Sequence, residues 1–473
     1  MADEYDMIVI GAGSGGIVAA RFAAQLEASV ALVEAFRPGG DCLYTGCVPS
    51  KALIRAAKVA WDVRHADHYG VEAVAAPVDL ARVMLHVREV IQRVYQFESV
   101  EALREEGIDV HLGTARFLDP HTIAVGEGVP LRGKRFLICT GARPSVPPIP
   151  GLDRVPYLTY QTVFDLQKLP ERLLVIGAGP VGLELAQAFL RLGSHVTCFS
   201  RSRRILSRAD PEISTILTQA LTDEGMTLRT ETKIERVEVG PDGAVTVHDD
   251  RDGVIGDALL VATGRRPNVD DLALSSAGVS WSDNGIAVDD QLRTNQSHIY
   301  ACGDVVGREQ FTHYAAWQGF MAVRNALLPG YTRGTSDRVP WTIFTDPEVA
   351  RVGLTEREAR ERYGDEVRVA LLSMDRVDRA QTEHDALGTI KIVVRGKGDI
   401  LGAHIVAARA GEMIHEYVLA LDHGLRMSDL ARPIHVYPTF STGNQQVASE
   451  YSTAATLRSS TGKIAKAIGE RLR

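Results

Sequence analysis

Two cysteines five residues apart, Cys42 and Cys47, stand between a glycine pair and a Pro-Ser-Lys segment. A regular helix would separate them by about 7.5 Å along its axis, whereas a disulfide needs Cα atoms within about 7 Å. Gly46 supplies the backbone freedom for a tighter turn, and Pro49 suits the first turn of a following helix. A thiolate near that helix start would have a lowered pKa. The segment predicts a dithiol that opens and closes; two ordinary reduced thiols, or half a metal site, are the alternatives.

A dinucleotide-binding unit precedes these cysteines. Residues 7–10 predict a buried parallel strand, 11–16 a glycine-rich turn and 17–25 an Ala-rich helix, and a second strand over 29–33 ends at Glu34. Glycines allow the tight turn and the approach of a pyrophosphate to the helix N-terminus. The acid, 18 residues after the last motif glycine, can accept hydrogen bonds from an adenosine ribose. The predicted cofactor contacts are Gly11, Gly13, Ser14, Gly15, Gly16 and Glu34.

The same unit occurs a second time with a different ending. A strand over 173–176 leads into a glycine motif at 177–182, a helix over 183–192 and a strand over 195–199. Here the acid is replaced by Ser200 and several arginines, whose guanidinium groups bind a 2′-phosphate bidentately. The pattern predicts NADPH rather than NADH; a solvated basic loop is the alternative. The predicted contacts are Gly177, Gly179, Val181, Gly182, Ser200, Arg201 and Arg203.

Together, two dinucleotide sites and one dithiol suggest an electron relay. Hydride from a nicotinamide could reduce a flavin, and the flavin could reduce a disulfide, because a flavin converts hydride chemistry to thiol chemistry.

Composition limits the other possibilities. The 473 residues suffice for two to four domains. A net charge of −8 without a basic block excludes nucleic acid and anionic lipid as expected partners. The acidic N-terminus runs straight into a strand, and no apolar run approaches 18 residues, so we expect no signal peptide, no membrane span and a cytoplasmic location. The remaining cysteines, in apolar runs, predict buried thiols with no assigned role: Cys139, Cys198 and Cys302.

Over essentially its whole length the chain resembles the flavoprotein disulfide reductases. These class I FAD-dependent pyridine nucleotide-disulfide oxidoreductases include dihydrolipoamide dehydrogenase, glutathione reductase and mercuric reductase. Besides the two glycine motifs, the resemblance rests on Cys-x4-Cys-Val-Pro-Ser-Lys and on the motifs at 138–144, 262–268, 300–304 and 345–353.

The resemblance implies a role for each site residue. FAD would occupy the first site, with Glu34 on its adenosine ribose and Asp304 near its ribityl chain. Cys42 would be the interchange thiol that meets substrate, and Cys47 the charge-transfer thiol beside the isoalloxazine. Lys51 would approach flavin N5 and pair with Glu184; two surface charges are the alternative. Further implied cofactor contacts are Gly40, Lys51, Ala115, Thr140, Gly141 and Gly264.

One departure from the family bears on the substrate. Members acting on dithiols or glutathione typically carry His-Pro-Thr-x-Ser-Glu near the C-terminus, where this chain has Tyr437 and Thr442 in place of the His and the Glu. Tyrosine, with a reference pKa near 10, is a poor base at neutral pH, and a positioned acid or base typically contributes about 10²–10⁴-fold. His435 would lie about 6–7 Å from the Tyr437 position in an extended segment. It is the weaker candidate for proton transfer, a structural histidine being the alternative.

A substrate that needs no proton shuttle fits this departure. A soft metal ion binds two thiolates directly, so Cys42 and Cys47 are also candidate ligands of a metal-ion substrate. Mercuric reductases resemble this chain in lacking the His-Glu pair and in an Arg-Ser after the second Rossmann strand. Their metal-carrier Cys-x-x-Cys module and C-terminal vicinal cysteines do not occur in this sequence.

The predicted function is therefore an NADPH-dependent FAD disulfide oxidoreductase that passes electrons to the Cys42–Cys47 dithiol and on to a soft metal ion or a small disulfide. Three alternatives stay open: a dihydrolipoamide dehydrogenase-like enzyme without the usual base, a soluble transhydrogenase or quinone reductase, and a redox-sensing protein.

The predicted fold is α/β, with two Rossmann-like domains and a C-terminal α+β dimerisation domain. We expect an FAD-binding domain at 1–150, with a helical insert at 80–106, and an NAD(P)-binding domain at 151–270. A central segment at 271–338 would complete the flavin site, and 339–473 would form the dimer interface, with a strand at 388–394 and a helix at 411–423. The resemblance implies a homodimer in which Tyr437 acts in the partner's active site.

Overall fold

The computed structural model describes residues 4–307 and 309–459. The predicted domains also include 1–3 and 460–473, which lie outside the described residues. The chain forms two compact units: the first contains residues up to 177, 191–194 and 234–336, and the second contains 178–190, 195–233 and the residues from 337 onward. Within the described ranges, no helix is both long and apolar enough to cross a membrane.

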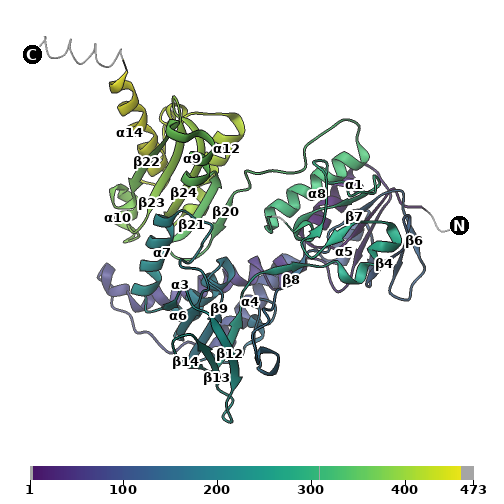
Figure 1. The fold of residues 1–473 in the computed structure, drawn as a ribbon, viewed down its shortest axis with the longest axis horizontal. Coiled ribbons are helices and arrows are strands. Elements are labelled where there is room, and N and C mark those ends of the chain that lie inside the picture. Colours follow the sequence, from purple (N-terminus) through teal and green to yellow (C-terminus); the bar gives the residue numbers. More distant parts are fainter. Residues whose placement is uncertain (1–3, 308, 460–473) are drawn as a thin grey trace, which may run out of the picture. The chain divides into compact units, whose positions relative to one another are not determined.

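The first unit contains a five-stranded parallel sheet (Figure 1). Its order is β19 (Ile299–Ala301), β7 (Phe136–Ile138), β1 (Met7–Ile10), β2 (Val30–Glu34) and β3 (Asp109–Leu112). Successive side chains of β1 face opposite ways. Met7 and Val9 pack with the helices α1 (Ser14–Gln25) and α8 (Thr312–Leu327), and Ile8 and Ile10 pack against a second, small sheet. That sheet consists of β4 (Ala115–Asp119), β5 (Thr122–Val125) and β6 (Leu131–Arg132).

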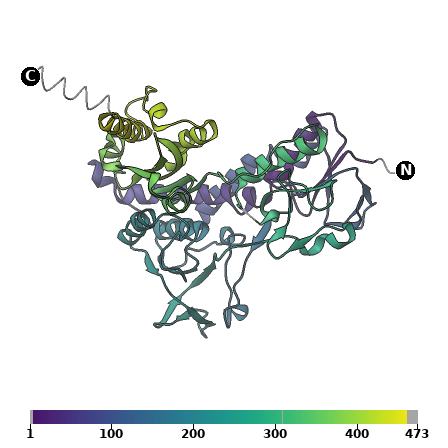
Figure 2. The same ribbon diagram turned by 45° about the horizontal axis from the view of Figure 1, so that its top comes forward.

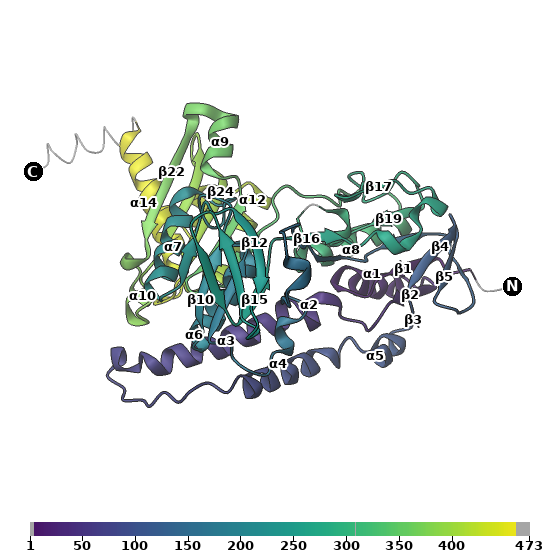
Figure 3. The same ribbon diagram turned by 60° about the horizontal axis from the view of Figure 1, so that its bottom comes forward.

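The segment between β2 and β3 is helical. It contains α2 (Gly40–Tyr44), α3 (Cys47–Arg64), α4 (Leu80–Tyr95) and α5 (Val100–Glu105), and α3 and α4 lie side by side (Figure 3). The predicted helical insert at 80–106 contains two helices, α4 and α5. The break has a local cause, because the side chain of Ser99 accepts a hydrogen bond from the backbone N–H of Ala102 and caps α5.

Short strands complete the first unit. They form the pairs β8 (Ala142–Pro144) with β16 (Arg265–Pro267), β9 (Arg172–Ile176) with β15 (Ala258–Val261), and β17 (Trp281–Ser282) with β18 (Gly285–Ile286). A three-stranded sheet contains β12 (Ile234–Val239), β13 (Val245–Asp249) and β14 (Gly253–Gly256).

The second unit contains a five-stranded antiparallel sheet with its own core. Its order is β20 (Trp341–Ile343), β21 (Glu348–Gly353), β24 (Asp399–Ala407), β23 (Thr389–Arg395) and β22 (Val367–Ser373). Helix α14 (Thr442–Arg458, yellow) lies against this sheet (Figure 2). The other helices are α9 (Glu356–Tyr363), α10 (Asp378–Thr382), α11 (Ala410–Met413), α12 (His415–His423) and α13 (Met427–Leu430). The helix predicted at 411–423 is therefore two helices.

Part of the second nucleotide unit lies here too. Helix α6 (Pro180–Leu192) starts three residues earlier than predicted, whereas β10 (His195–Phe199) has the predicted bounds and pairs with β11 (Thr227–Arg229). Helix α7 (Pro211–Asp223) follows them.

A buried lysine links α7 to the sheet. The side chain of Lys391 is 1% exposed and its Nζ lies 3.0 Å from Asp210 and 2.8 Å from Glu356, with Glu212 also in contact. Burial by itself lowers the pKa of Lys391, but the three carboxylates outweigh it and the pKa is raised. His404, equally buried, lies 3.3 Å from Asp210, and burial lowers its pKa to about 3. Lys391 is thus the cation that balances the negative charge of these carboxylates.

Replacing Lys391 with Met should therefore destabilise the protein, by roughly 3 kcal/mol, because it leaves the buried Asp210 carboxylate without a counter-charge. Unfolding in urea, followed by circular dichroism, measures the loss. Lys134→Met is the matched control, since Lys134 forms its 2.8 Å ion pair with Asp6 at an exposed position. Equal losses in the two variants would contradict the role of burial.

Candidate active site

The backbone of the first glycine loop packs directly against the backbone of two other segments. Gly11 has φ +103°, and a Cβ there would lie 2.5 Å from the carbonyl oxygen of Cys139. Similarly, a Cβ on Gly40 would lie 2.8 Å from the Cα of Gly13, so the segment before Cys42 packs directly on the loop. Because α1 begins at Ser14, its unpaired N–H groups and positive dipole end are available to a pyrophosphate. These features fit the FAD expected from the sequence.

Glu34 holds the same loop from the end of β2. Its Oε2 accepts a hydrogen bond from Ala12 N at 2.7 Å and its Oε1 accepts one from Phe36 N at 3.0 Å. Burial raises the pKa of Glu34, and these two hydrogen bonds lower it by less, so the net shift is upward. A carboxylate has about four acceptor positions, which leaves capacity for ribose hydroxyls.

Cys42 and Cys47 lie on opposite sides of a helix break. Cys42 belongs to α2, which ends at Tyr44, and Cys47 is the first residue of α3. The segment is therefore as irregular as the spacing predicts, and the side chains of the two residues, both free thiols, are hydrogen-bonded to each other. Cys42 is half-buried, whereas Cys47 is exposed.

Two helix N-termini meet at these thiols. Cys47 starts α3, and its Sγ lies 3.3 Å from the hydroxyl of Thr312, the first residue of α8. Both helix ends favour a thiolate. For Cys42, which lies before the start of α3, the hydrogen bond with Cys47 and burial raise the pKa, and weaker hydrogen bonds with Thr312 and Ser14 oppose them. The helix ends thus favour a thiolate at Cys47, whereas the pKa of Cys42 is raised.

Arg265 connects the thiol segment to Asp304. Its guanidinium lies 2.7 Å from an oxygen of Asp41 and 2.7 Å from an oxygen of Asp304, and Tyr160 donates a hydrogen bond to Asp41 at 2.8 Å. Burial raises the pKa of Asp304, and Arg265 counteracts part of the rise. Sequence reasoning assigned no role to Asp41, Tyr160, Arg265 or Thr312. Asp41 and Arg265 lie within motifs that it used, but nothing in the sequence pointed to Tyr160 or Thr312.

The other predicted flavin contacts lie in the same unit. Thr140 donates to the carbonyl oxygen of Asn268 at 2.7 Å, and the N–H of Asn268 donates to the carbonyl oxygen of Gly141 at 3.0 Å. Asn268 therefore joins the motif at 138–144 to the motif at 262–268, whose Gly264 accepts a hydrogen bond from the N–H of Ser145 at 2.9 Å. Ala115 is buried at the start of β4, and Lys51 stands on α3 one turn after Cys47.

Gly177 belongs to the first unit, whereas the later residues of the second glycine motif and its basic end belong to the second. Gly177 has φ +118°, and a Cβ there would lie 2.3 Å from the carbonyl oxygen of Ala262. The later motif residues Gly179, Val181 and Gly182 flank or belong to the start of α6. After β10, Ser200 accepts a hydrogen bond from the N–H of Ser202 at 3.2 Å, and Arg201 and Arg203 are exposed. Glu184, only 7% exposed, accepts a hydrogen bond from the N–H of Phe344 at 2.9 Å; its pairing with Lys51 stays a prediction.

The C-terminal segment around Tyr437 carries exposed apolar side chains. Ile434, Val436 and Tyr437 are 98%, 77% and 69% exposed. Tyr437 donates a hydrogen bond to Asp378 at 2.7 Å, which raises its pKa, so it is an even poorer base than an ordinary tyrosine. His435 lies 3.0 Å from Glu416 through Nε2 and 3.2 Å from the carbonyl oxygen of Pro433 through Nδ1. With both ring nitrogens engaged, His435 has the contacts of a structural histidine.

The pyridine nucleotide-disulphide oxidoreductase profile matches residues 5–319, and the dimerisation domain of the same group matches residues 339–448. This chain belongs to that family. A mercuric reductase of Bacillus cereus is 39% identical over 93% of this chain and 70% of its own length. A dihydrolipoyl dehydrogenase of Thermus scotoductus is 37% identical over 94% of this chain and 96% of its own length.

Among solved structures, the Cu(II) complex of the HOCl-induced flavoprotein disulfide reductase RclA from Escherichia coli has a TM-score of 0.84. It is 30% identical and covers 93% of this chain and 98% of its own. Membership in the oxidoreductase family confirms the predicted fold class and makes the chain an enzyme, a flavoprotein that uses FAD and a pyridine nucleotide. The matched dimerisation domain supports a homodimer.

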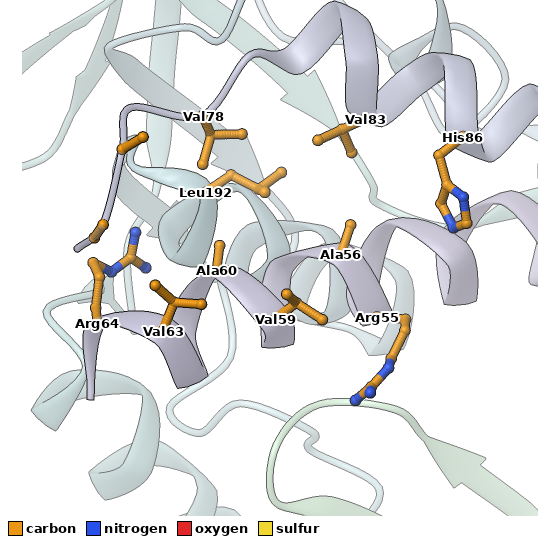
Figure 4. A pocket seen from close by; sticks show the side chains of 12 residues that line it. Arg55, Ala56, Val59, Ala60, Val63, Arg64, Val78, Val83, His86 and Leu192 are labelled. Atoms are coloured by element: carbon orange, nitrogen blue, oxygen red, sulfur yellow. The ribbon is translucent and has the colours of Figure 1, made fainter. Parts of the chain in front are cut away.

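A hollow of about 520 Å³ also lies in the first unit, apart from the predicted oxidoreductase site. Figure 4 shows it between α3 and α4, where Ala56, Val59 and Ala60 face Val83 and Leu192. None of the predicted site residues lines it.

Replacing Arg265 with Gln removes the cation shared by Asp41 and Asp304, so the pKa of Asp304 should rise further. A carboxyl whose pKa is raised in the folded state stabilises the fold when protonated and loses that contribution as pH rises through the folded pKa. We therefore expect the variant to release FAD at a temperature several degrees lower at pH 7.5, with a smaller difference at pH 5. Flavin fluorescence during heating measures this.

The neighbouring variant Arg266→Gln provides the control. Arg266 is 48% exposed and pairs with Asp283, itself 84% exposed, so it should release FAD like the native protein at both pH values. A pH-independent loss in Arg265→Gln would show that Asp304 does not titrate as argued.

Proposed function

We propose that this oxidoreductase uses NADPH to reduce a soft divalent metal ion bound by Cys42 and Cys47. The observation that carries the proposal is the thiol pair itself: the two thiols are hydrogen-bonded to each other, with Cys47 exposed. Two thiolates bind a soft ion directly. The names of the relatives, a mercuric reductase and a Cu(II) complex of a disulfide reductase, support this class of substrate.

The chain's own residues would handle protons and charge. FAD, held by the first glycine loop, supplies the conversion of a hydride from NADPH into electrons for the thiol pair. Cys47 provides the first thiolate at the two helix ends, and Cys42 loses its proton when the ion binds, because metal ligands must be deprotonated. For Hg²⁺ the overall balance is NADPH plus Hg²⁺ giving NADP⁺, H⁺ and the metal atom.

The partner subunit would complete the site. The exposed apolar side chains of Ile434, Val436 and Tyr437 favour burial against a second copy, since the matched dimerisation domain includes this segment. We infer that Tyr437 acts in the partner's active site as a polar neighbour of the bound ion rather than as a base, because its hydroxyl donates to Asp378.

A small disulfide is the second candidate substrate. The dihydrolipoyl dehydrogenase relative favours it, and such a substrate needs a proton carrier near Cys42. His435, paired with Glu416 at 3.0 Å, is the histidine nearest in sequence to the family position. Its second nitrogen faces the carbonyl oxygen of Pro433, however, so proton transfer would require that contact to open. The metal ion therefore remains the preferred substrate.

An anaerobic titration of the purified yellow protein with NADPH, then with Hg²⁺ or Cu²⁺, tests the proposal. We expect a long-wavelength thiolate-to-flavin absorption band on reduction, which the ion discharges while NADPH consumption continues. A band without turnover on either ion would favour an organic disulfide, or a redox sensor if every acceptor fails. The absence of the band would favour a transhydrogenase or quinone reductase.

Single variants separate the thiols from the rest of the protein. Cys42→Ser and Cys47→Ser should each abolish metal-ion reduction while bound FAD remains reducible by NADPH. Cys198→Ala is the matched control, because Cys198 is a buried thiol of β10 and 1% exposed, and it should retain activity. Full activity in both Ser variants would overturn the dithiol mechanism.

Replacing Arg201 and Arg203 with Ala tests the preference for NADPH. We expect the KM for NADPH to rise about tenfold or more, since charge-assisted hydrogen bonds to the 2′-phosphate are lost, and the KM for NADH to change little. Steady-state kinetics with both nucleotides measures this. Arg154→Ala, at an exposed position of the first unit, should leave both values unchanged. Equal effects on NADPH and NADH would refute a 2′-phosphate contact.

A further inference from the structure

A second pair of cysteines meets in the interior of the first unit. Cys139 and Cys302 are separated by 163 positions in the chain, yet their Sγ atoms lie 3.2 Å apart. Both are buried, at 8% and 1% exposure. The sequence predicted separate buried thiols, and the structure confirms their burial but not their separation. The mechanism proposed for Cys42 and Cys47 does not use them.

The strand pairing fixes how these thiols face each other. Cys139 follows β7 and Cys302 follows β19, and in the parallel register Ala301 stands opposite Ile138, so the two cysteines are the next residues along both strands. Neighbouring strands are about 4.8 Å apart, within the usual range of about 4.4–6.8 Å between disulfide Cα atoms. Closing the bond, about 2.05 Å long, requires the sulfurs to approach by about 1.2 Å.

The pair lies beneath the first glycine loop. The Sγ of Cys302 is 3.1 Å from the position of a Cβ on Gly15, and the carbonyl oxygen of Cys139 packs against Gly11. Thr140, directly after Cys139, and Asp304, two residues after Cys302, are predicted flavin contacts. A bond between the two sulfurs would therefore join the two strands on which the predicted flavin site is built.

We propose that Cys139 and Cys302 form a second redox site, a modification site that a peroxide converts into a disulfide. Two S–H bonds break and one S–S bond forms, while the two electrons and two protons reduce hydrogen peroxide to two molecules of water. The disulfide fastens the returning strand β19 to β7. Because it restrains a long stretch of the unfolded chain, the oxidised protein resists thermal unfolding of the flavin-binding unit.

The two cysteine pairs differ in how readily they react. Thiolates, not thiols, are the nucleophiles in oxidation. Burial and the hydrogen bond with Cys302 raise the pKa of Cys139, whereas the exposed Cys47 lies at two helix ends. The inner pair is thus the slower of the two to oxidise, and it responds to sustained rather than brief exposure to peroxide.

The test uses the FAD-loaded Cys42→Ser/Cys47→Ser protein, in which three cysteines remain. After treatment with hydrogen peroxide, the protein is denatured, alkylated without reductant, digested and analysed by mass spectrometry. We expect a cross-linked peptide pair containing Cys139 and Cys302, reversed by dithiothreitol, and a rise of several degrees in the temperature of FAD release. Cys198 should remain alkylated in the same sample.

Variants of the pair complete the experiment. Cys139→Ser and Cys302→Ser should each abolish the cross-link and the thermal shift, whereas Cys198→Ala should retain both. If one serine variant fails to bind FAD, Cys139→Ala or Cys302→Ala replaces it. Three alkylatable thiols after prolonged treatment, or sulfinic acid on Cys139 without a cross-link, would overturn the proposal. A cross-link without any thermal shift would overturn its stabilising role.

Discussion

The first unit depends on one shared cation. Arg265 lies between Asp41, which directly precedes the thiol pair, and Asp304, which arrives from the far end of the unit. Neither carboxylate could be held near the other without it, because burial already raises the pKa of Asp304. A guanidinium presents several donors in a fixed plane. Arg265 therefore fixes the orientation of the two carboxylates relative to each other and also balances their charge. The thiol segment and the predicted flavin cradle are therefore placed relative to each other by one side chain.

The starts of two helices lie at the thiol pair. The start of α3 carries Cys47, and the start of α8 brings Thr312 to its sulfur at 3.3 Å. Helix ends act as fixed partial charges that need no counter-ion, and Cys47 is exposed beside them. The hydrogen bond with Cys47 and burial raise the pKa of Cys42. The asymmetry of the pair thus comes from backbone placement.

Much of the local structure could be predicted from the sequence. The strands β1 and β10 have their predicted bounds, because β1 is a continuous apolar run that ends before Gly11 and β10 ends before the polar Ser200. Contacts between segments that are distant in the sequence could not be predicted from these local patterns. In the sheet, β19 lies beside β7. The spacing of apolar residues along the chain does not show which strands become neighbours, so the sequence predicted Cys139 and Cys302 as two separate thiols. Tyr437 was found through its motif, but its partner Asp378 lies in a separate helix with no signal of its own.

The order of strands in the first sheet also has a consequence for biosynthesis. The edge strand β19 and the first residue of α8 follow the glycine loop that they complete by about 290 residues. At about 5–20 residues per second on the ribosome, the nascent glycine loop waits tens of seconds for Asp304 and Thr312. During that interval one edge of β7 lacks its partner strand, and the earlier thiols are already outside the ribosome. A chaperone that covers this edge would act before the flavin site can form.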